Sequence, residues 1–198
     1  MTHPPGDRPR RIAAAHDVVG GRYRLRESLG GSRVVWRAHD DLLDREVAVR
    51  EVGTPPGSTS SEILDRQLAT MLEALAAGAV DHPGIVPVLD VVWRPDRCWI
   101  VMAYVPGRSL REAVEADGPL DRRTAAATGL ALLGALRAAH AAGLAHGDVR
   151  PGTVLLADDG RVLLTDFGLG GTGGSAAGDV LALASTIAAA VSDVDRVT

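Results

Sequence analysis

The sequence contains no lysine and no asparagine, so all 21 of its basic residues are arginine. This compositional bias is by itself one explanation for an arginine that stands where a lysine would be expected. The single cysteine, Cys98, excludes an internal disulfide bond and fits a reducing interior, which favours a cytoplasmic protein. Phenylalanine also occurs only once, as Phe167.

A strong positive charge and a long apolar run are missing as well. The formal net charge is −4 and the isoelectric point is near 5.8, which argues against nucleic acid as a partner. The longest apolar helical run, 180–191, falls short of the ~20 residues that cross a bilayer, and residues 1–17 lack the apolar core of a signal peptide. We therefore expect a soluble chain without a membrane span.

The patterning of the chain predicts an α+β fold with two lobes. With 198 residues and 46% hydrophobic content, the chain is long enough for two lobes around a shared cleft. Residues 1–20 are expected to form a disordered tail, residues 21–105 a strand-rich lobe and residues 106–198 a mainly helical lobe. The predicted strands are 22–29, 33–40, 45–52, 82–93, 97–105 and a pair within 153–166, and the predicted helices are 62–78, 109–117, 122–143 and 180–191.

Six motifs follow one another in a fixed order: "VAVR", "LEALAAGAVDHPGIV", "VMAYVPGRSL", "HGDVRPGTVLL", "TDFG" and "GDVLALA". Together they resemble the signature motifs of protein kinases, and the bacterial Ser/Thr kinases of eukaryotic type in particular. The resemblance covers about residues 20–190. It implies a two-lobed kinase-like fold, with a complete β-rich N-lobe that carries one helix and a truncated helical C-lobe.

The resemblance also implies a nucleotide cleft. Arg50 stands at the position of the strand lysine that holds the nucleotide phosphates, and Glu73 at that of its glutamate partner, with a solvated helix residue as the less favoured reading of Glu73. Gly30 and Gly31 remain from a glycine-rich loop that is about two residues short. The other residues implied to contact the nucleotide are Leu29, Val35 and Ala48 (which could also be ordinary sheet core), Met102 as gatekeeper, Ala103 and Val105 as hinge, and Leu155 as adenine floor.

Catalytic roles are implied for four further residues. Asp148 resembles the catalytic base, and Arg150 stands for the lysine that meets the transferred phosphate. Asp166 of "DFG" resembles a magnesium ligand, and Thr153 replaces the asparagine that is the family's second ligand. Gly147 replaces an arginine that pairs with a phosphorylated activation loop in much of the family, so switching by such a phosphate is not expected.

The segment after Asp166 departs most from the family pattern. Asp179 follows Asp166 by only 13 positions, where the family places a much longer activation loop and substrate platform. We therefore expect a pseudokinase with weak or absent binding of ATP and Mg²⁺, which acts on a protein partner or by self-association through its incomplete C-lobe. Two alternatives remain open: an active Ser/Thr kinase that uses Arg50 in place of lysine, and a kinase-like small-molecule phosphotransferase.

Overall fold

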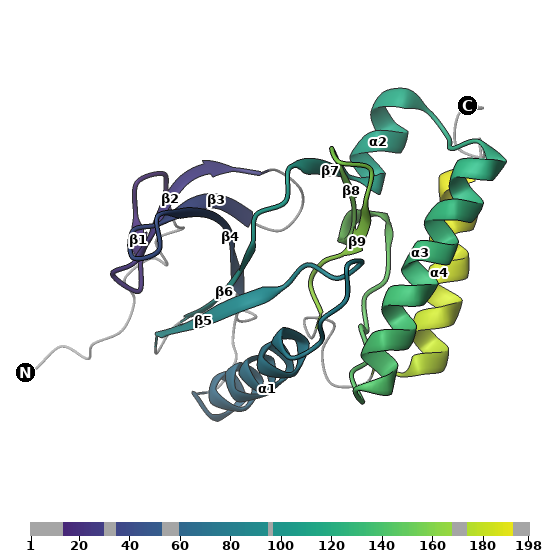
Figure 1. The fold of residues 1–198 in the computed structure, drawn as a ribbon. Helices are drawn as coiled ribbons and strands as arrows, with labels where there is room; N and C mark the ends of the chain where they lie inside the picture. The colour runs from purple at the N-terminus through teal and green to yellow at the C-terminus, as the bar shows by residue number, and fades with distance from the viewer. Residues whose placement is uncertain (1–13, 30–34, 53–59, 95–96, 168–173, 192–198) are drawn as a thin grey trace, which may run out of the picture.

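The computed structural model describes residues 14–29, 35–52, 60–94, 97–167 and 174–191. Within these ranges the chain forms two lobes, a sheet with one helix and a mainly helical lobe with a small sheet (Figure 1). The α+β arrangement predicted from the sequence is confirmed.

The N-lobe is built on a six-stranded sheet in the order β1-β2-β3-β4-β6-β5, in which every neighbouring pair is antiparallel. Its strands are β1 (Val18–Val19), β2 (Tyr23–Ser28), β3 (Val35–Asp40), β4 (Arg45–Val52), β5 (Val88–Arg94) and β6 (Arg97–Ala103). Helix α1 (Ser60–Gly78) packs against β5 and β6. Strand β1 lies inside the segment for which the sequence predicts a tail, because Val18 and Val19 pair with β2.

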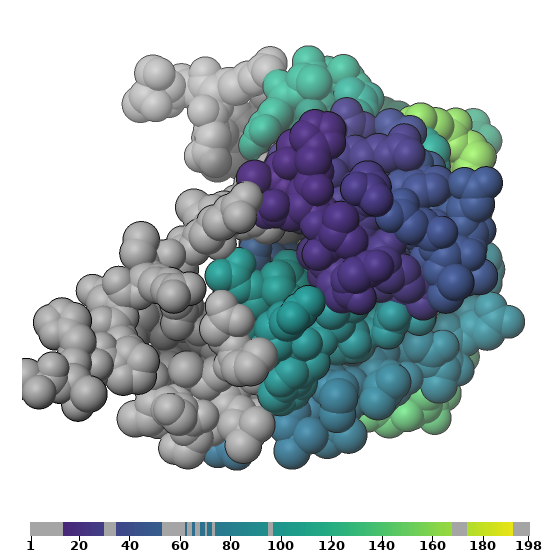
Figure 2. Space-filling view, turned by 90° about the vertical axis from the view of Figure 1, so that its left-hand side faces the viewer, coloured from purple at the N-terminus to yellow at the C-terminus, as the bar shows by residue number. Residues whose placement is uncertain are grey.

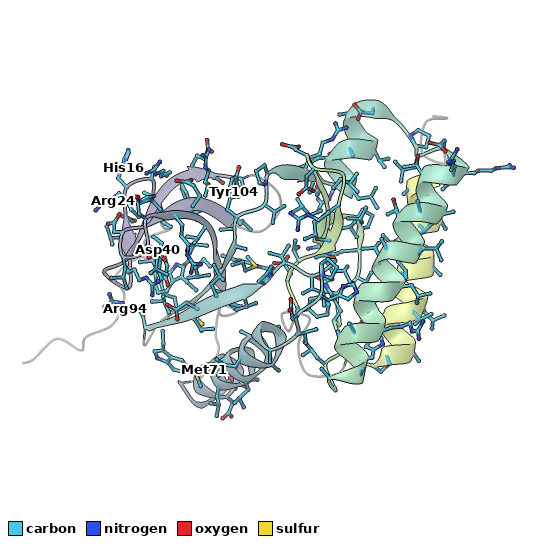
Figure 3. All side chains as sticks on the ribbon, in the orientation of Figure 1. His16, Arg24, Asp40, Met71, Arg94 and Tyr104 are labelled. Atoms are coloured by element: carbon cyan, nitrogen blue, oxygen red, sulfur yellow. The ribbon has the colours of Figure 1, made fainter. Side chains whose placement is uncertain are left out.

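Alternating side chains place one face of the N-lobe sheet in its core. In β3, Trp36, Ala38 and Asp40 are buried while the residues between them are half-buried, as expected for a strand with one inward face. Asp40 is fully buried, and its carboxylate accepts hydrogen bonds from Arg22 Nε at 2.6 Å and Nη2 at 2.7 Å. Figure 3 shows Asp40 among the strands at the end of the N-lobe that lies away from the C-lobe. Figure 2 shows the molecule from that side. The first strands, in purple and blue, form the upper part of this face, and later segments of the N-lobe, in teal, lie lower in the view.

The C-lobe begins with β7 (Gly107–Ser109), which joins β8 (Val154–Ala157) and β9 (Val162–Leu164) in a three-stranded sheet. Helix α2 (Leu110–Asp117) starts with a capping box between Ser109 and Glu112, and α3 (Arg122–Ala141) starts with the side chain of Asp121 on two backbone amides. Helix α4 (Ala176–Val191) begins four residues before the predicted start and packs along α3 (Figure 1).

Two backbone hydrogen bonds fasten the lobes together next to the cleft. The amide of Val86 donates to the carbonyl of Leu164 at 2.9 Å, and the amide of Leu164 donates to the carbonyl of Gly84 at 2.8 Å. The segment that leads into β5 is thereby held on β9, beside the start of the "DFG" motif. Among the described helices, none is both long and apolar enough to cross a membrane.

Candidate functional site

A cavity of about 320 Å³ lies between the lobes, within the size range of small-molecule sites. Its apolar wall consists of six residues that the sequence predicts to contact a nucleotide: Leu29, Val35, Ala48, Ala103, Val105 and Leu155. Strands β3 and β4 supply much of the N-lobe part of this wall, and β8 supplies the C-lobe part. The wall offers an apolar surface of the kind against which an aromatic ring packs.

The predicted gatekeeper and hinge lie at the back of this cavity. Met102 is buried and packs with Ala48 and Leu163 rather than lining the cavity. The amide of Ala103 donates to the carbonyl of Pro87 at 2.9 Å, so this hinge residue is held by the chain itself. Gly30 and Gly31 lie outside the described residues, and Glu73 lies on α1 with a side chain that is not described.

At the inner end of the cavity, Arg50 and Asp166 form an ion pair. Nη1 of Arg50 contacts Oδ1 of Asp166, and the two side chains are only 6% and 9% exposed. Asp166 lines the cavity, whereas Arg50 lies behind it on β4. Asp166 has a positive φ of 69°, a conformation in which aspartate is found more readily than most residues. A carboxylate that is neutralised and largely withdrawn from water in this way is a poor acceptor for a second cation.

The predicted base and its neighbouring cation also form an ion pair. Nε of Arg150 donates to both carboxylate oxygens of Asp148, at 3.1 and 3.0 Å. Both side chains keep part of their surface in water, with 29% of Arg150 and 22% of Asp148 exposed. Arg150 lines the cavity, so a group that enters from the cleft meets the guanidinium group.

Thr153 is fully buried, and its hydroxyl group is used inside its own loop. Oγ1 lies within donating distance of the carbonyls of Asp148 at 2.8 Å and of Arg150 at 3.0 Å, and it accepts from the amide of Arg150 at 3.1 Å. The residue that replaces asparagine thus closes the turn of the loop. Its role as a metal ligand stays a prediction from the sequence, and it does not line the cavity.

Asp179, at the start of α4, holds the loop that carries Asp148. Its carboxylate accepts from the amides of His146 at 2.7 Å and Gly147 at 2.8 Å, and it lies 2.7 Å from Nε2 of His140. Burial alone would raise the pKa of Asp179, but these hydrogen bonds outweigh it and lower the pKa below its usual value. The interaction ties α3, the loop and α4 together.

His146 forms the other support of this loop. It is 1% exposed, its Nε2 lies 2.9 Å from the carbonyl of Thr165, and its Nδ1 accepts from the amide of Asp148 at 3.2 Å. Burial lowers the pKa of His146, which fits a neutral imidazole with its proton on Nε2. Its ring also contacts that of Phe167, with centroids 4.5 Å apart, so Phe167 sits in the core of the C-lobe.

The backbone after the "DFG" motif passes close to the loop at Gly147. A side chain carbon added at Gly174 would come within 2.9 Å of the Cα of Gly147, closer than such atoms approach. Gly147 itself has a positive φ of 75°. The position where the family has an arginine is therefore occupied by a close contact between two glycine backbones.

The sequence interpretation missed several residues that line the cavity. Arg111 on α2 meets Arg150 above Gly152: a side chain carbon at Gly152 would lie 2.6 Å from Nη1 of Arg150 and even closer to Nη2 of Arg111. The remaining lining residues that it missed are Tyr104, Gly107, Arg108, Ser109, Glu112, Glu115 and Thr165. The capping box at Ser109 was the available signal, because it fixes the start of α2 and so turns Arg111 and Glu115 toward the cleft. Figure 3 shows Tyr104 at the edge of the N-lobe that faces the C-lobe.

The fold and this cleft define a class: a two-lobed protein with an apolar-walled cavity between its lobes and two carboxylate–guanidinium pairs, Arg50–Asp166 and Arg150–Asp148, one member of each pair lining the cavity. A family model described as "Protein kinase domain" matches residues 28–182. The chain belongs to the protein kinase family, and the resemblance inferred from its motifs is confirmed.

Individual relatives agree with this assignment. The chain is 43% identical over 142 residues to the serine/threonine-protein kinase PknK of Mycobacterium tuberculosis, and 33% identical over 153 residues to the serine/threonine-protein kinase PrkC of Bacillus subtilis. These matches cover 71% and 76% of the chain. Among solved structures, a mutant form of the kinase domain of M. tuberculosis PknI superposes with a TM-score of 0.78 at 25% identity, covering 91% of this chain and 77% of that one. The kinase-like two-lobed fold expected from the sequence is therefore confirmed.

The chain spans a small part of these curated relatives, 12% of PknK and 23% of PrkC. Proteins of the family use ATP and Mg²⁺. The residues present do not fit a magnesium site of the family type. Asp166 is paired with Arg50, the Thr153 hydroxyl is taken by its own loop, and no group of three His, Cys, Asp or Glu side chains in the described ranges is placed to hold a metal ion.

Proposed function

We propose that this kinase-family chain is a pseudokinase, a nucleotide-binding or partner-binding signalling module with weak or no phosphotransfer. The observation that carries the proposal is the buried ion pair between Arg50 and Asp166. It joins the residue at the phosphate-binding lysine position to the residue at the metal-binding position, so neither is presented to a nucleotide as phosphotransfer requires.

Other features support the loss of transfer while leaving the cleft open to a ligand. The apolar wall of the cavity is intact, which supports nucleotide entry. The residue at the second metal position, Thr153, serves the loop instead. Catalysis of phosphoryl transfer consists mostly of positioning and charge stabilisation, so displaced cations lower the rate far more than they lower binding.

A radiolabelled ATP assay with magnesium or manganese tests the proposal, with a generic protein substrate and with the chain alone. We expect no incorporation above that of Asp148→Asn. Incorporation by the unmodified chain that both Asp148→Asn and Asp166→Asn abolish would overturn the proposal. An Asp159→Asn control changes an exposed carboxylate that lies outside the cleft.

The second candidate is an active Ser/Thr kinase that uses Arg50 in place of lysine. Asp148 is retained, and Asp166 lines a cavity of adequate volume, which favours this candidate, as do the serine/threonine kinases among the relatives. The same assay decides between the candidates, because only this one requires transfer that depends on both carboxylates.

Exposed apolar residues on α3 and α4 support a role in partner binding. Leu130 and Leu133 lie on α3 and are 71% and 37% exposed, and Val180 and Leu181 lie on α4 and are 45% and 70% exposed. Apolar groups that are this exposed on two packed helices favour contact with a protein surface. We propose that this surface, the α3–α4 patch, mediates self-association or binding of a protein partner, in the cytoplasm.

A further inference from the structure

The positive charge next to Asp166 in the cleft belongs to a side chain of the protein, that of Arg50. Asp166, which lines the cavity, is paired with Arg50, and the two side chains are almost withdrawn from water. Separating such a pair leaves a buried charge without its partner, which is strongly unfavourable. A divalent ion that enters the cleft would have to compete with Arg50 for the carboxylate and would be repelled by the same guanidinium group.

The loop that carries Asp148 and Thr153 offers magnesium few other oxygen ligands. Magnesium requires oxygen ligands in near-octahedral geometry and gives up its water reluctantly. The hydroxyl group of Thr153 makes three contacts to the backbone of its own loop and is fully buried. The carboxylate of Asp148 is already held on both oxygens by Arg150.

The cavity also presents guanidinium groups to an anion. Arg150 and Arg111 both line the cavity, and their nitrogens converge above Gly152. Asp148 holds Arg150 through Nε, whereas Nη1 of Arg150 lies close to Nη2 of Arg111, so an anion beside these two terminal nitrogens would lower their mutual repulsion. Guanidinium groups bind phosphate oxygens through two parallel hydrogen bonds, so this pair forms a site suited to phosphate.

We propose that the cleft binds an adenine nucleotide in its metal-free form. Arg50 cancels the charge of Asp166, which would otherwise repel the phosphates, and Arg111 and Arg150 contact the phosphate oxygens. Together these three arginines supply the positive charge that magnesium supplies in the family. The inference rests on the proposed function, because it describes how a chain without phosphotransfer still holds a nucleotide.

Isothermal titration calorimetry of the full chain with ATP, in EDTA and in excess magnesium, tests the proposal. We expect ATP to bind at least as tightly in EDTA as in magnesium, because magnesium adds positive charge where three arginines already lie. In Arg50→Lys, the shorter ammonium group leaves room at Asp166, so we expect magnesium to tighten binding by about tenfold or more. An Arg161→Lys control changes an exposed Arg–Asp pair outside the cleft and should behave as the unmodified chain does.

Two further variants keep the test decisive if Arg50→Lys does not fold. Asp166→Asn should retain ATP binding both in EDTA and in magnesium, whereas at a site that depends on a metal held by Asp166 it would abolish the binding seen in magnesium. Arg111→Ala should weaken ATP binding by about tenfold, and adenosine binding hardly at all, because adenosine has no phosphate. Thermal melts without nucleotide check that each variant is folded.

The outcomes separate this inference from the proposed function. Binding that tightens tenfold or more with magnesium in the unmodified chain overturns the inference alone. No binding of ATP under any condition overturns the inference and the nucleotide-binding part of the proposed function, while the partner-binding part stands. Phosphate transfer in the radiolabel assay overturns the proposed function itself.

Discussion

At the scale of single residues, replacements in this chain preserve charge but change what the charge can do. Arg50 keeps the positive charge of a lysine, yet its guanidinium group lies against Asp166 instead of facing the cavity. Thr153 keeps a polar group at the position of an asparagine, yet its hydroxyl group is hydrogen-bonded to the backbone of its own loop. A compositional bias against lysine and asparagine explains why such residues occur, but the geometry explains what they do.

His146 is the residue whose charge we expect to affect stability near neutral pH. Its pKa is lowered by burial, so below the unfolded pKa of about 6.5 the unfolded chain binds a proton that the folded chain does not. The free energy of unfolding should therefore fall as the pH falls below about 6.5, with a contribution of up to about 1.4 kcal/mol per pH unit from this residue. Urea unfolding between pH 5 and 7.5, about the range that histidine titrates over, measures the slope.

A pair of variants isolates this contribution. His146→Gln removes the titrating group, so its slope over that pH range should be shallower than that of the unmodified chain. His16→Gln changes an exposed histidine and should leave the slope as it was. Equal slopes for the unmodified chain and His146→Gln would show that His146 does not bind its proton as we expect.

At the scale of elements, the N-lobe sheet and the C-lobe helices are each anchored by one buried carboxylate. Asp40 holds β2, β3 and the turn after β3 through Arg22 and the amides of Leu42 and Leu43. Asp179 holds α3, α4 and the loop between them through His140, His146 and Gly147. In both places the carboxylate accepts several hydrogen bonds and so links separate segments of the chain.

Asp40→Asn should destabilise the N-lobe by about 2–4 kcal/mol, because the new amide group presents a donor to Arg22 and leaves that cation poorly paired. The hydrogen bonds from Arg22 hold the pKa of Asp40 well below its usual range, so this stabilisation is present above about pH 4 and is lost as the pH falls further. The free energy of unfolding in urea at neutral pH measures the effect.

The neighbouring Asp41→Asn is a matched control. Asp41 pairs with Arg24 at 2.7 Å, but 35% of its side chain is exposed, and such pairs contribute at most about 1 kcal/mol. Equal effects of the two substitutions would contradict the anchoring role of Asp40.

At the scale of the whole molecule, the sequence predicted most of the fold because hydrophobic alternation and turn residues carry it. Strand β4 and helix α2 follow from local patterns. Strand β1 was missed because two residues are too few to show an alternation of polar and apolar side chains. Strand β7 was missed because its three residues include glycine and a charged residue.

The candidate site was predicted in part, for a related physical reason. A motif indicates which residue types occur at which positions, so Leu29, Ala48 and Leu155 could be placed on one cavity wall. It does not indicate which side chains pair with each other across the fold. The contact of Arg50 with Asp166 and the proximity of Arg111 and Arg150 at Gly152 join segments far apart in sequence and needed the structure.

Self-association through the α3–α4 patch is an expectation at this same scale. We expect Leu181→Glu to shift sedimentation velocity profiles toward a single monomeric species, because it places a charge in the patch. Leu42→Glu is the control: Leu42 is 71% exposed, close to the 70% of Leu181, but lies in a turn of the N-lobe. An unmodified chain that is monomeric at all concentrations would refute self-association and leave a different protein as the partner.

The central claim, that Arg50 takes the place of a metal ion in the cleft, is tested most directly by the electron paramagnetic resonance signal of free Mn²⁺. Manganese binds the same oxygen ligands as magnesium, and ATP in solution binds Mn²⁺ and so lowers the concentration of free Mn²⁺. If the cleft takes up metal-free ATP, adding the protein to a Mn²⁺–ATP mixture releases manganese, so the free signal should rise, and Arg50→Lys should reverse this. A free signal that falls when the unmodified protein is added would contradict the claim.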